Sequence, residues 1–481
     1  MANKAGLAQC ATAGAETPDV RCDRAALLDA SGRTDEARQL YLAILATAPD
    51  HAATLNNLGA LLYRTGYRTA ARTAFLQAVA CHPALPHAHV QLGNLLREDG
   101  AFATARAHYE AALAAAPNFA EAHQGLGGAL AGLGDHAAAA DHWRRGYRNN
   151  VFSPCTYRGV APPVRVLLLF SVAGGNIPVR AFLDDTVFAP VAVAMEFYTS
   201  SHTLPPHDLV LNTIGDADLC RDALKAAIRL LRRTNAPVIN HPVAVLATGR
   251  VANAHRFAAM PGVRAPRTVR IARHRLVREL ARRGSAWPVL LRTPGFHTGQ
   301  HFVRVDNEAA LPEAVASLPG DDVLAIEYLD ADGGDGFVRK GRVMIIGGRL
   351  FPLHWAASPH WKVHYFTAGM VERAAHRAEE ACFLADMNGF IGTKAVASLQ
   401  AIAARLGLEY GGIDFALSPS GEILLFEANA TMALVAPGAD AIWDYRRAAI
   451  DAAADAMRNM LKKKAKEGPL FRKKKQTTFA R

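Results

Sequence analysis

The sequence of 481 residues lacks several features that mark particular classes of protein. No run of eighteen apolar residues occurs, and residues 1–24 have no apolar core of the kind found in secretory signals. The six cysteines are scattered without a Cys-x-x-Cys spacing, which argues against a zinc site and a disulfide framework. We therefore expect a cytoplasmic protein with free thiols and without a membrane partner.

A deficit of acidic residues gives the chain a net charge of +11, but much of it lies near the C-terminus. Residues 462–481 contain nine Lys or Arg residues and one Glu, which leaves only about +3 for the rest of the chain. This segment has no apolar periodicity, so we predict a basic disordered tail. Such a tail is either a solvated end or a non-specific contact for an acidic partner or RNA. The rest of the chain gives no reason to expect nucleic acid.

The length suggests roughly two to four domains, and the first of these carries an internal repeat of 34 residues. Three columns recur at that spacing: Gly59, Gly93 and Gly127; Phe75, Tyr109 and Trp143; Pro49, Pro83 and Pro117. A small residue lets two helices approach closely, an aromatic ring fills the gap between them, and proline ends the second helix. The pattern resembles the tetratricopeptide repeat.

The resemblance predicts an all-α solenoid over residues 24–150, preceded by a flexible leader at 1–23. Solenoids of this kind usually hold a peptide on their concave face, so the resemblance implies a peptide or protein partner. Candidate lining residues are polar positions on the predicted first helices, which otherwise form plain surface. They are Asn56, Asn57, Tyr63, Gln91, Asn94, Arg97 and Gln124.

Three prolines break the helical pattern in residues 151–163, where we expect a linker. The apolar run at 164–172 then predicts a buried parallel strand, and residues 164–240 read as a small α/β unit. A turn at 173–176 follows this strand. Its two glycines fall short of the dinucleotide-binding fingerprint, so the turn by itself does not assign a phosphate site.

A predicted β-hairpin near the C-terminus carries three hard oxygen donors. Apolar runs at 413–417 and 423–426 flank a four-residue turn, with Asp414 on one strand and Glu427 and Asn429 at the end of the other. Converging carboxylate and amide oxygens suit Mg²⁺, or Mn²⁺ in its place. The alternative is an ordinary hairpin with solvated acids at its rim. The order of these residues resembles the metal-binding hairpin of the ATP-grasp superfamily.

Further segments resemble ATP-grasp motifs in the family's order. Residues 240–245 match an Asn-x-Pro opening segment, and residues 266–268 match a Pro-x-Thr step. Arg292 ends an apolar strand where the family usually has a phosphate-binding lysine; arginine keeps the charge and binds phosphate in a bidentate manner. His297, Thr298 and Gly299 then lie where the family has a Gly-rich lid over the phosphates.

The resemblance also implies a nucleotide-binding hinge at the end of the strand at 323–329. Glu327, Tyr328 and Leu329, with Asp335, match the segment that holds adenine and ribose, and a basic strand follows. On that strand, Arg342 is the preferred partner of the transferring phosphate and Lys340 the second. Residues 350–367 crowd histidine and aromatic side chains together. They form either a substrate-binding wall, with His354 or Lys362 meeting a carboxylate, or an aromatic packing loop with surface histidines.

Together these resemblances imply a multidomain protein: an all-α tetratricopeptide solenoid, an α/β Rossmann-like pre-ATP-grasp domain and an α+β ATP-grasp domain at 241–461. The implied activity is an ATP-dependent carboxylate–amine ligase that forms an acylphosphate, with Arg342 and Arg292 acting on the phosphoryl group and Asp414, Glu427 and Asn429 holding the metal. Two alternatives remain open. One is an ATP-grasp fold without turnover that acts as a scaffold for protein partners, and the other is a kinase of the same fold.

Overall fold

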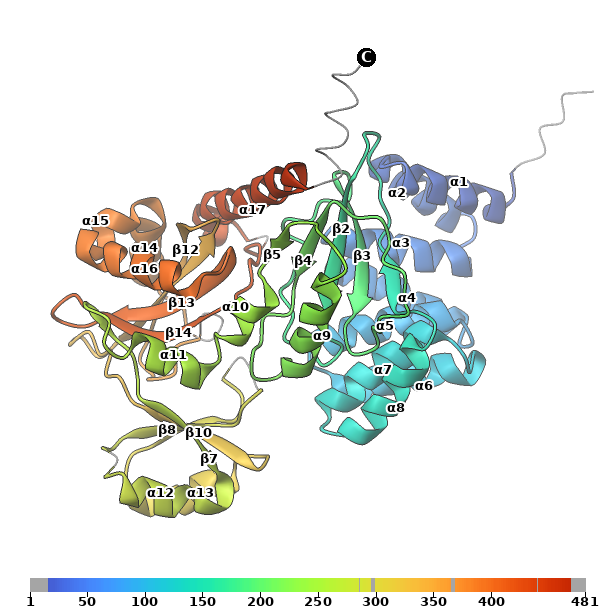
Figure 1. Ribbon diagram of the computed structural model, residues 1–481. Helices are drawn as coiled ribbons and strands as arrows, with labels where there is room; N and C mark the ends of the chain where they lie inside the picture. The colour runs from blue at the N-terminus through green and yellow to red at the C-terminus, as the bar shows by residue number, and fades with distance from the viewer. Residues whose placement is uncertain (1–15, 285, 296–298, 365–367, 439, 469–481) are drawn as a thin grey trace, which may run out of the picture. The chain divides into compact units, whose positions relative to one another are not determined.

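The computed structural model describes residues 16–284, 286–295, 299–364, 368–438 and 440–468 (Figure 1). The chain divides into two compact units. The first contains Met1–Pro163 together with Asp185–Pro190, and the second contains Val164–Asp184 together with Val191–Arg481.

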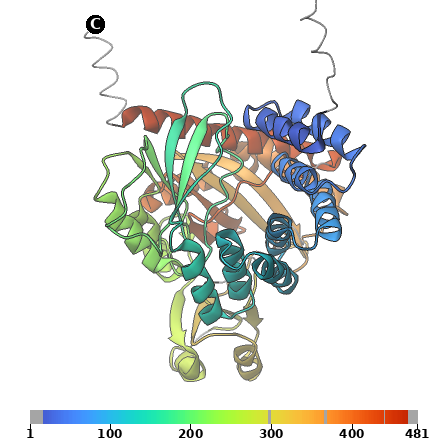
Figure 2. The same cartoon turned by 90° about the vertical axis from the view of Figure 1, so that its right-hand side faces the viewer.

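Eight α-helices in tandem make up most of the described part of the first unit. They are α1 (Pro18–Ala30), α2 (Thr34–Leu45), α3 (Ala52–Arg64), α4 (Arg68–Cys81), α5 (Pro86–Glu98), α6 (Phe102–Ala115), α7 (Ala120–Gly132) and α8 (His136–Tyr147). Figures 1 and 2 show them as successive helix pairs, coloured blue to teal. A short strand, β1 (Phe152–Pro154), follows, and the Cys155 N–H donates to the carbonyl oxygen of Pro190 at 2.9 Å.

The repeated glycines and aromatics pack against each other inside each helix pair, as the 34-residue period predicts. A Cβ atom added at Gly93 on α5 would lie 2.8 Å from the ring of Tyr109 on α6. The same addition at Gly127 on α7 would lie 2.5 Å from Trp143 on α8. Because neither gap admits a methyl group, the glycine column sets how closely the two helices of a repeat approach.

Helix α1 corrects the prediction of a flexible leader that ends at residue 23. The helix begins at Pro18, and the hydroxyl of Thr17 accepts a hydrogen bond from the Val20 N–H. Thr-Pro-Asp is a typical start of a helix, since threonine caps the free N–H groups and proline fits the first turn. The repeat region therefore starts earlier than the aromatic and glycine columns alone suggest.

The second unit begins with a mainly parallel sheet in which β3 (Phe188–Ala194), β2 (Val164–Phe170), β4 (Leu209–Asn212) and β5 (Val238–Ile239) are adjacent in that order. Strands β2, β4 and β5 run parallel, and α9 (Arg221–Leu231) connects β4 to β5. The strand predicted at 164–172 is present as β2. The prediction had no strand at 188–194, where a proline interrupts the apolar run.

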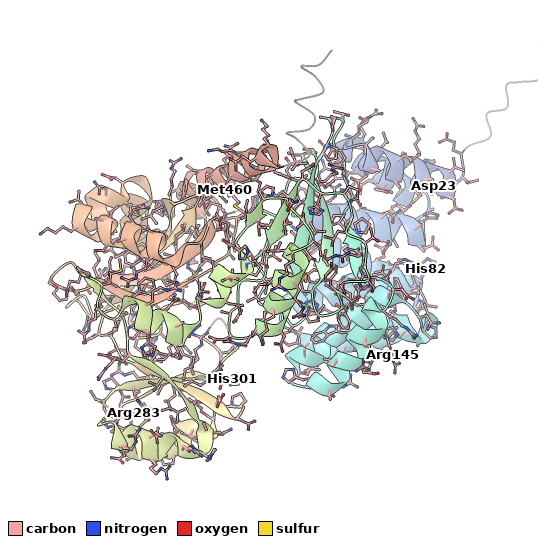
Figure 3. All side chains as sticks on the ribbon, in the orientation of Figure 1. Asp23, His82, Arg145, Arg283, His301 and Met460 are labelled. Carbon is pink, nitrogen blue, oxygen red and sulfur yellow. The ribbon has the colours of Figure 1, made fainter. Side chains whose placement is uncertain are left out.

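Two further sheets complete this unit. The first is antiparallel, in the order β7 (Thr268–Ala272), β10 (Asp322–Glu327), β8 (Val289–Arg292), β9 (Phe302–Val305), and packs on α12 (Leu276–Arg282) and α13 (Leu311–Ala316). The second has the order β12 (Arg349–Ser358), β11 (Val338–Ile346), β13 (Tyr410–Leu417), β14 (Ile423–Asn429), β6 (Val263–Arg264). Side chains fill the space between these sheets and their helices (Figure 3).

Helices α14 (Ala374–Ala385), α15 (Met387–Ile391), α16 (Thr393–Leu406) and α17 (Arg447–Glu467) cover the third sheet. Helix α17 corrects the predicted start of the basic tail at residue 462. Leu461 and Ala465 are fully buried and continue the helical spacing of Ala453, Ala454 and Met457. The lysines at 462–464 therefore lie on an ordered helix whose apolar face is packed. The rest of the predicted tail, 469–481, lies outside the described residues.

Candidate functional site

A cavity of about 1060 Å³ lies in the second unit. Strands β8, β10, β11, β12, β13 and β14 all contribute to its wall, and so do α11 (Arg250–Phe257) and the turn after β2. The turn enters through Gly175 and Asn176. A volume of this size is enough for a nucleotide and a second small molecule.

The cavity brings together predicted site residues that are up to 137 positions apart in the sequence. The predicted residues on its wall are Arg292, Gly299, Glu327, Tyr328, Leu329, Lys340, Arg342, His354, Lys362, Asp414, Glu427 and Asn429. Asp335 does not line it; its carboxylate pairs with Arg339 at 2.8 Å, away from the wall. His297 and Thr298 lie outside the described residues.

The predicted hairpin is formed by β13 and β14, and Asp414 lies directly opposite Glu427. The register shifts between Asp414 and Phe415, so one extra residue is accommodated on β14. The turn has five residues rather than the predicted four: the Ser418 N–H donates to the Glu422 carbonyl at 2.9 Å, and Gly421 has a φ of +79°. Both carboxylates face the cavity.

Asp414 is held by two cations from the neighbouring strand β11. Arg342 donates through Nε to Oδ1 at 2.5 Å and through Nη2 to Oδ2 at 2.8 Å, and Lys340 Nζ lies 3.2 Å from Oδ2. Burial alone would raise the pKa of Asp414, but Arg342 and Lys340 hold it well below its usual range. The same pairing outweighs burial at Arg342 and raises its pKa. Both groups are therefore charged across the physiological range.

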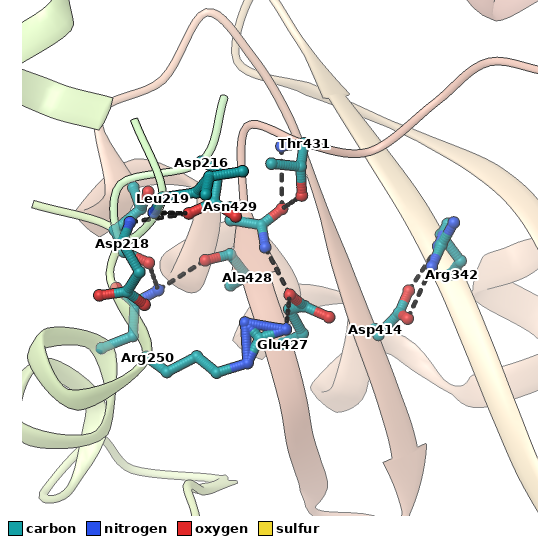
Figure 4. A network of polar contacts seen from close by, with 12 residues as sticks. Asp216, Asp218, Leu219, Arg250, Arg342, Asp414, Glu427, Ala428, Asn429 and Thr431 are labelled. Atoms are coloured by element: carbon teal, nitrogen blue, oxygen red, sulfur yellow. Dashed lines mark hydrogen bonds and ion pairs between the residues drawn. The ribbon is translucent and has the colours of Figure 1, made fainter. Parts of the chain in front are cut away.

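Glu427 belongs to a second polar network on the same wall (Figure 4). Arg250 Nη2 donates to Glu427 Oε1 at 2.5 Å, and Asn429 Nδ2 donates to the same oxygen at 2.7 Å. Asn429 Oδ1 in turn accepts from the N–H and the hydroxyl of Thr431, at 3.0 and 2.8 Å. These bonds fix the amide of Asn429 and orient the carboxylate of Glu427.

Two buried asparagines fasten this hairpin to the rest of the unit. Asn240, which has a φ of +50°, donates to the Tyr410 carbonyl at 2.6 Å and accepts from the Tyr410 N–H at 3.0 Å. Asn253 Nδ2 on α11 donates to the carbonyl of Ala428 at 2.5 Å. The Asn-x-Pro segment thus contributes by holding the start of β13 in place.

Arg292 is buried at the end of β8, with 9% of its surface exposed. Burial, and then the charge of Arg250, lowers its pKa to about 10, while Glu427 and Asp216 act in the opposite direction. The guanidinium remains charged at neutral pH and lies 5.2 Å from the ring centre of Phe302. A buried cation on a cavity wall is a strong attractor for an anionic ligand.

The predicted nucleotide hinge lies at the end of β10, next to apolar wall residues. Glu327 accepts from the N–H of Arg267 at 3.0 Å and from its Nε at 3.2 Å. Burial would raise the pKa of Glu327, but these bonds lower it. Its carboxylate is therefore engaged in holding the hinge. Leu290 and Ile326 provide apolar surface for a flat ring nearby.

In the segment at 350–367, one face of strand β12 lines the cavity and the other packs against aromatic rings. Along β12, His354 lines the cavity, while Trp355 packs among the rings of Phe383, Phe390 and Phe415 at 5.2 to 6.0 Å. Successive side chains on a strand point to opposite faces. The segment therefore contributes both to the cavity wall and to packing, and His354 is buried and not at the surface. Substrate binding by this wall stays a prediction.

Lys362 and His354 differ in the charge that they can offer a ligand. Lys362 Nζ donates to the Gly299 carbonyl at 3.2 Å, which connects the loop after β12 to the predicted lid. Burial, followed by the charge of Arg342, keeps the pKa of His354 well below its ordinary value. At neutral pH Lys362 is the cation of the pair and His354 is neutral.

Positive charge dominates the wall as a whole. Its ionisable residues, apart from His354, His364 and Tyr328, comprise six cations and three carboxylates. The cations are Arg250, Arg292, Lys340, Arg342, Lys362 and Arg446; the carboxylates are Glu327, Asp414 and Glu427. A wall of this composition favours a ligand with several negative charges.

Sequence reasoning assigned no role to several residues of this wall, notably Arg250, Asn176 and Arg446, while Trp361 belongs to the segment at 350–367 that it did single out. Arg250 lies 177 positions from Glu427, with which it pairs. Local spacing carries no signal for such a long-range contact. Only the position of Arg250, ten residues after Asn240 in the opening motif, pointed to this region.

The donors at the hairpin suit a hard divalent cation in type, because they are carboxylate and amide oxygens. In the structure Arg342, Lys340 and Arg250 engage the carboxylate oxygens, and Thr431 engages the amide oxygen of Asn429. Across the parts of the chain that the structure describes, no three His, Cys, Asp or Glu side chains are grouped closely enough to hold a metal ion. Two carboxylates and one amide leave positions around a six-coordinate ion that other oxygens, such as those of water or phosphate, would fill.

Most of the predicted peptide-contacting residues of the first unit are already used inside it. Five of the seven are hydrogen-bonded within the unit: Asn56, Asn57, Tyr63, Asn94 and Gln124. Asn94, for example, accepts from the Tyr109 hydroxyl at 2.8 Å, and Gln124 donates to the Gly146 carbonyl at 3.0 Å. These side chains stabilise the helix stack, so a peptide would have to compete for them.

Comparison with known proteins assigns the first unit. The family model of the tetratricopeptide repeat matches residues 22–86 and 90–154, so this part of the chain consists of tetratricopeptide repeats. The match ends at residue 154 and covers less than half of the chain. Repeats of this kind indicate protein partners.

Solved structures that are similar to the chain include several of MamA. MamA MSR-1 is 21% identical, with a TM-score of 0.24, over 28% of this chain and 78% of that one. MamA from Desulfovibrio magneticus RS-1 is 23% identical, with a TM-score of 0.25, over 27% and 75% of the two chains. No curated protein matches the chain. None of the described helices is both long and apolar enough to cross a bilayer.

Proposed function

We propose that this chain, whose N-terminal part consists of tetratricopeptide repeats, is an ATP-dependent carboxylate–amine ligase. The observation that supports the proposal is the convergence of twelve predicted site residues on one cationic cavity. These residues come from six strands and from three loops. An arrangement that only stabilised the fold would not require six cations to face one cavity with three carboxylates.

In the proposed reaction, an oxygen of the substrate carboxylate attacks the γ-phosphorus of ATP, and ADP leaves with the electron pair of the broken P–O bond. The amine then attacks the acyl carbon, inorganic phosphate leaves, and the amine loses a proton. Arg292 and Arg342 lie on the wall where they would stabilise charge on the transferring phosphoryl group. Removing one preorganised donor of this kind costs about 2.7–4 kcal/mol of transition-state stabilisation.

Other wall residues would position the substrates. Leu290 and Ile326 would cover the base of the nucleotide next to the hinge at Glu327. Lys362 is the cation that would meet the substrate carboxylate, because His354 is neutral and can only donate or accept a hydrogen bond. Holding both substrates in one cavity would bring the acylphosphate and the amine together and limit the access of water.

Asp414, Glu427 and Asn429 are the residues that would hold Mg²⁺ (or Mn²⁺), which when bound supplies charge neutralisation to the phosphates. Asp414 and Glu427 are paired with cations, and Asn429 is bonded to Glu427 and Thr431, so the three side chains are oriented before any ligand arrives. A polyphosphate would offer Arg250, Arg342 and Lys340 an alternative anion. The ion pairs therefore keep the wall ordered without a ligand.

Binding of Mg²⁺–ATP is the first test, since it requires no knowledge of the other substrates. Titration calorimetry of the full chain is expected to detect binding that Glu427→Gln loses. Asp335→Asn is the matched control, because this acid was also predicted to contact the nucleotide but lies off the wall. Absence of binding by the wild type at millimolar ATP would refute the proposal.

Turnover distinguishes ligation from the two alternatives. Hydroxylamine added with ATP and a mixture of amino acids or peptides would capture an acylphosphate as a hydroxamate. A kinase would instead leave a stable phosphorylated product and no hydroxamate, and a scaffold without turnover would release no ADP. We also propose that the repeats recruit a peptide or protein, which would make one substrate part of a larger chain.

A further inference from the structure

Two histidine pairs in the first unit have the same geometry, one in each of two successive repeats. His89 on α5 faces His108 on α6 with 3.1 Å between their Nδ1 atoms. His123 on α7 faces His142 on α8 with 2.9 Å between the same atoms. The two pairs are 34 residues apart, the period of the repeat.

The hydrogen bonds within each pair determine where the lone pairs point. His89 Nε2 lies 2.9 Å from the carbonyl of Pro83, and His123 Nε2 lies 3.0 Å from that of Pro117. A carbonyl only accepts, so each Nε2 carries the proton and each Nδ1 presents its lone pair to the opposite ring. A metal-binding histidine usually donates its other ring N–H to a group such as a backbone carbonyl. His89 and His123 have this arrangement.

Packing does not require histidine at these positions. The preceding repeat has Leu55 and Ala74 where the two later repeats have their histidine pairs, and both of these residues are buried. The inner histidines are equally well buried, with 6% of the surface of His89 and of His123 exposed. The chain therefore contains, in its own sequence, an apolar version of the same helix contact.

We propose that each pair, His89 with His108 and His123 with His142, is a binding site for a divalent transition-metal ion such as Zn²⁺, Ni²⁺ or Cu²⁺. Imidazole nitrogen is a preferred ligand of these ions and a poor one for Mg²⁺. Two nitrogens at about 2.05 Å from a tetrahedral ion are about 3.3 Å apart. The separation of the Nδ1 atoms therefore needs to change by only a few tenths of an ångström, and each ring must also turn so that its Nδ1 lone pair points at the ion.

Metal binding by a pair conserves the number of protons on its two rings and needs no added reagent. In the metal-free pair, His108 Nδ1 donates the shared proton to His89 Nδ1. On binding, this proton leaves Nδ1 for solvent and His108 takes one up at Nε2, so both rings stay neutral. His108 and His142 are half-buried, which leaves room for water molecules to complete the coordination. The ion would connect the two helices of its repeat.

The test is a Zn²⁺ titration of the untagged full chain by calorimetry at pH 7.5, after removal of bound metal with a chelator. The wild type is expected to bind two ions through these pairs. H89L/H108A and H123L/H142A, which copy the residues of the second repeat, are each expected to lose one. The quadruple variant should lose both, so that any Zn²⁺ binding that remains is about tenfold or more weaker than in the wild type.

H136A, which removes an exposed histidine from α8, is the matched control and should leave both sites unchanged. Circular dichroism of each variant establishes that it is folded. In electron paramagnetic resonance, the Cu²⁺-loaded wild type should show hyperfine coupling to imidazole nitrogen that the quadruple variant lacks. Equal Zn²⁺ affinity and stoichiometry in the wild type and the folded quadruple variant would overturn the proposal, and the pairs would then share protons only. Mg²⁺–ATP binding by the quadruple variant is expected to stay intact.

Discussion

Replacement of Asp414 by asparagine removes one negative charge from the most tightly held group on the cavity wall. The side chain of Asp414 is 5% exposed, and its carboxylate accepts two hydrogen bonds from Arg342 and one from Lys340. An amide at this position keeps the size and shape of the side chain. Arg342 and Lys340 would lose their counter-ion, and the N–H₂ group of the new amide would face one of these two cations.

The expected loss of stability follows from the burial of the three groups. Breaking a buried ion pair by removing one partner costs about 3–5 kcal/mol, because the remaining charge is buried without compensation. The side chains of Arg342 and Lys340 are 23% and 13% exposed, so water reaches both cations in part. We therefore expect the lower end of the range, about 3 kcal/mol.

Urea unfolding followed by tryptophan fluorescence provides the assay. Four of the five tryptophans, Trp287, Trp355, Trp361 and Trp443, belong to the second unit, so the signal reports mainly on this unit. Asp335→Asn is a suitable control because it removes a carboxylate from an exposed ion pair with Arg339, where solvent already screens the charges. No measurable change is expected for this control.

The acid dependence offers a second measure of the same pairing. Since the pKa of Asp414 lies well below its usual range in the folded chain, its contribution is complete above the unfolded value of about 3.9. It declines below that pH by about 1.36 kcal/mol per unit. Asp414→Asn should lack this part of the decline. A loss of less than about 1 kcal/mol, or an unchanged acid slope, would refute the account of the buried pairing.

Three further predictions concern other parts of the chain. Gly127→Ala should destabilise the repeat unit by about 1–3 kcal/mol, measured by thermal melting, because the new methyl group meets Trp143 at 2.5 Å. Asn240→Ala should destabilise the second unit by about 1–3 kcal/mol for each backbone group of Tyr410 left without its partner, measured by urea unfolding. Burial, and then the neighbouring imidazole, lowers the pKa of His108, so the stability gained from its neutral form should be lost as pH falls below about 6.5. A pH series of melting temperatures checks this, and a melting temperature independent of pH between 7 and 5 would contradict it.

Sequence alone was sufficient wherever the structure depends on contacts that repeat at a fixed spacing. The 34-residue period placed helix pairs, and the glycine and aromatic columns identified their packing partners, because each repeat contacts mainly its neighbours. The hairpin at 413–427 was also predictable, since two apolar runs around a Ser-Pro-Ser-Gly turn specify local antiparallel pairing. The family resemblance added the residues that the cavity later gathered.

The errors lay at the ends of elements and in irregular runs. Helix α1 begins inside the predicted leader, because Thr17 caps its first turn and Pro18 fits the first helical position. Helix α17 continues into the predicted tail, because Leu461 and Ala465 bury an apolar face that the surrounding lysines concealed. Strand β3 was missed where Pro190 interrupts its pattern.

Tertiary structure alone decided which charges meet. Segments far apart in the sequence determine three features of the site. These are the pairing of Arg250 with Glu427, the hydrogen bonds of Asn240 to Tyr410 and the position of Asp335 outside the cavity. No local spacing encodes such contacts, because they arise only when separate sheets are packed. The electrostatic state of a side chain likewise depends on its burial and its neighbours, and these exist only in the folded chain.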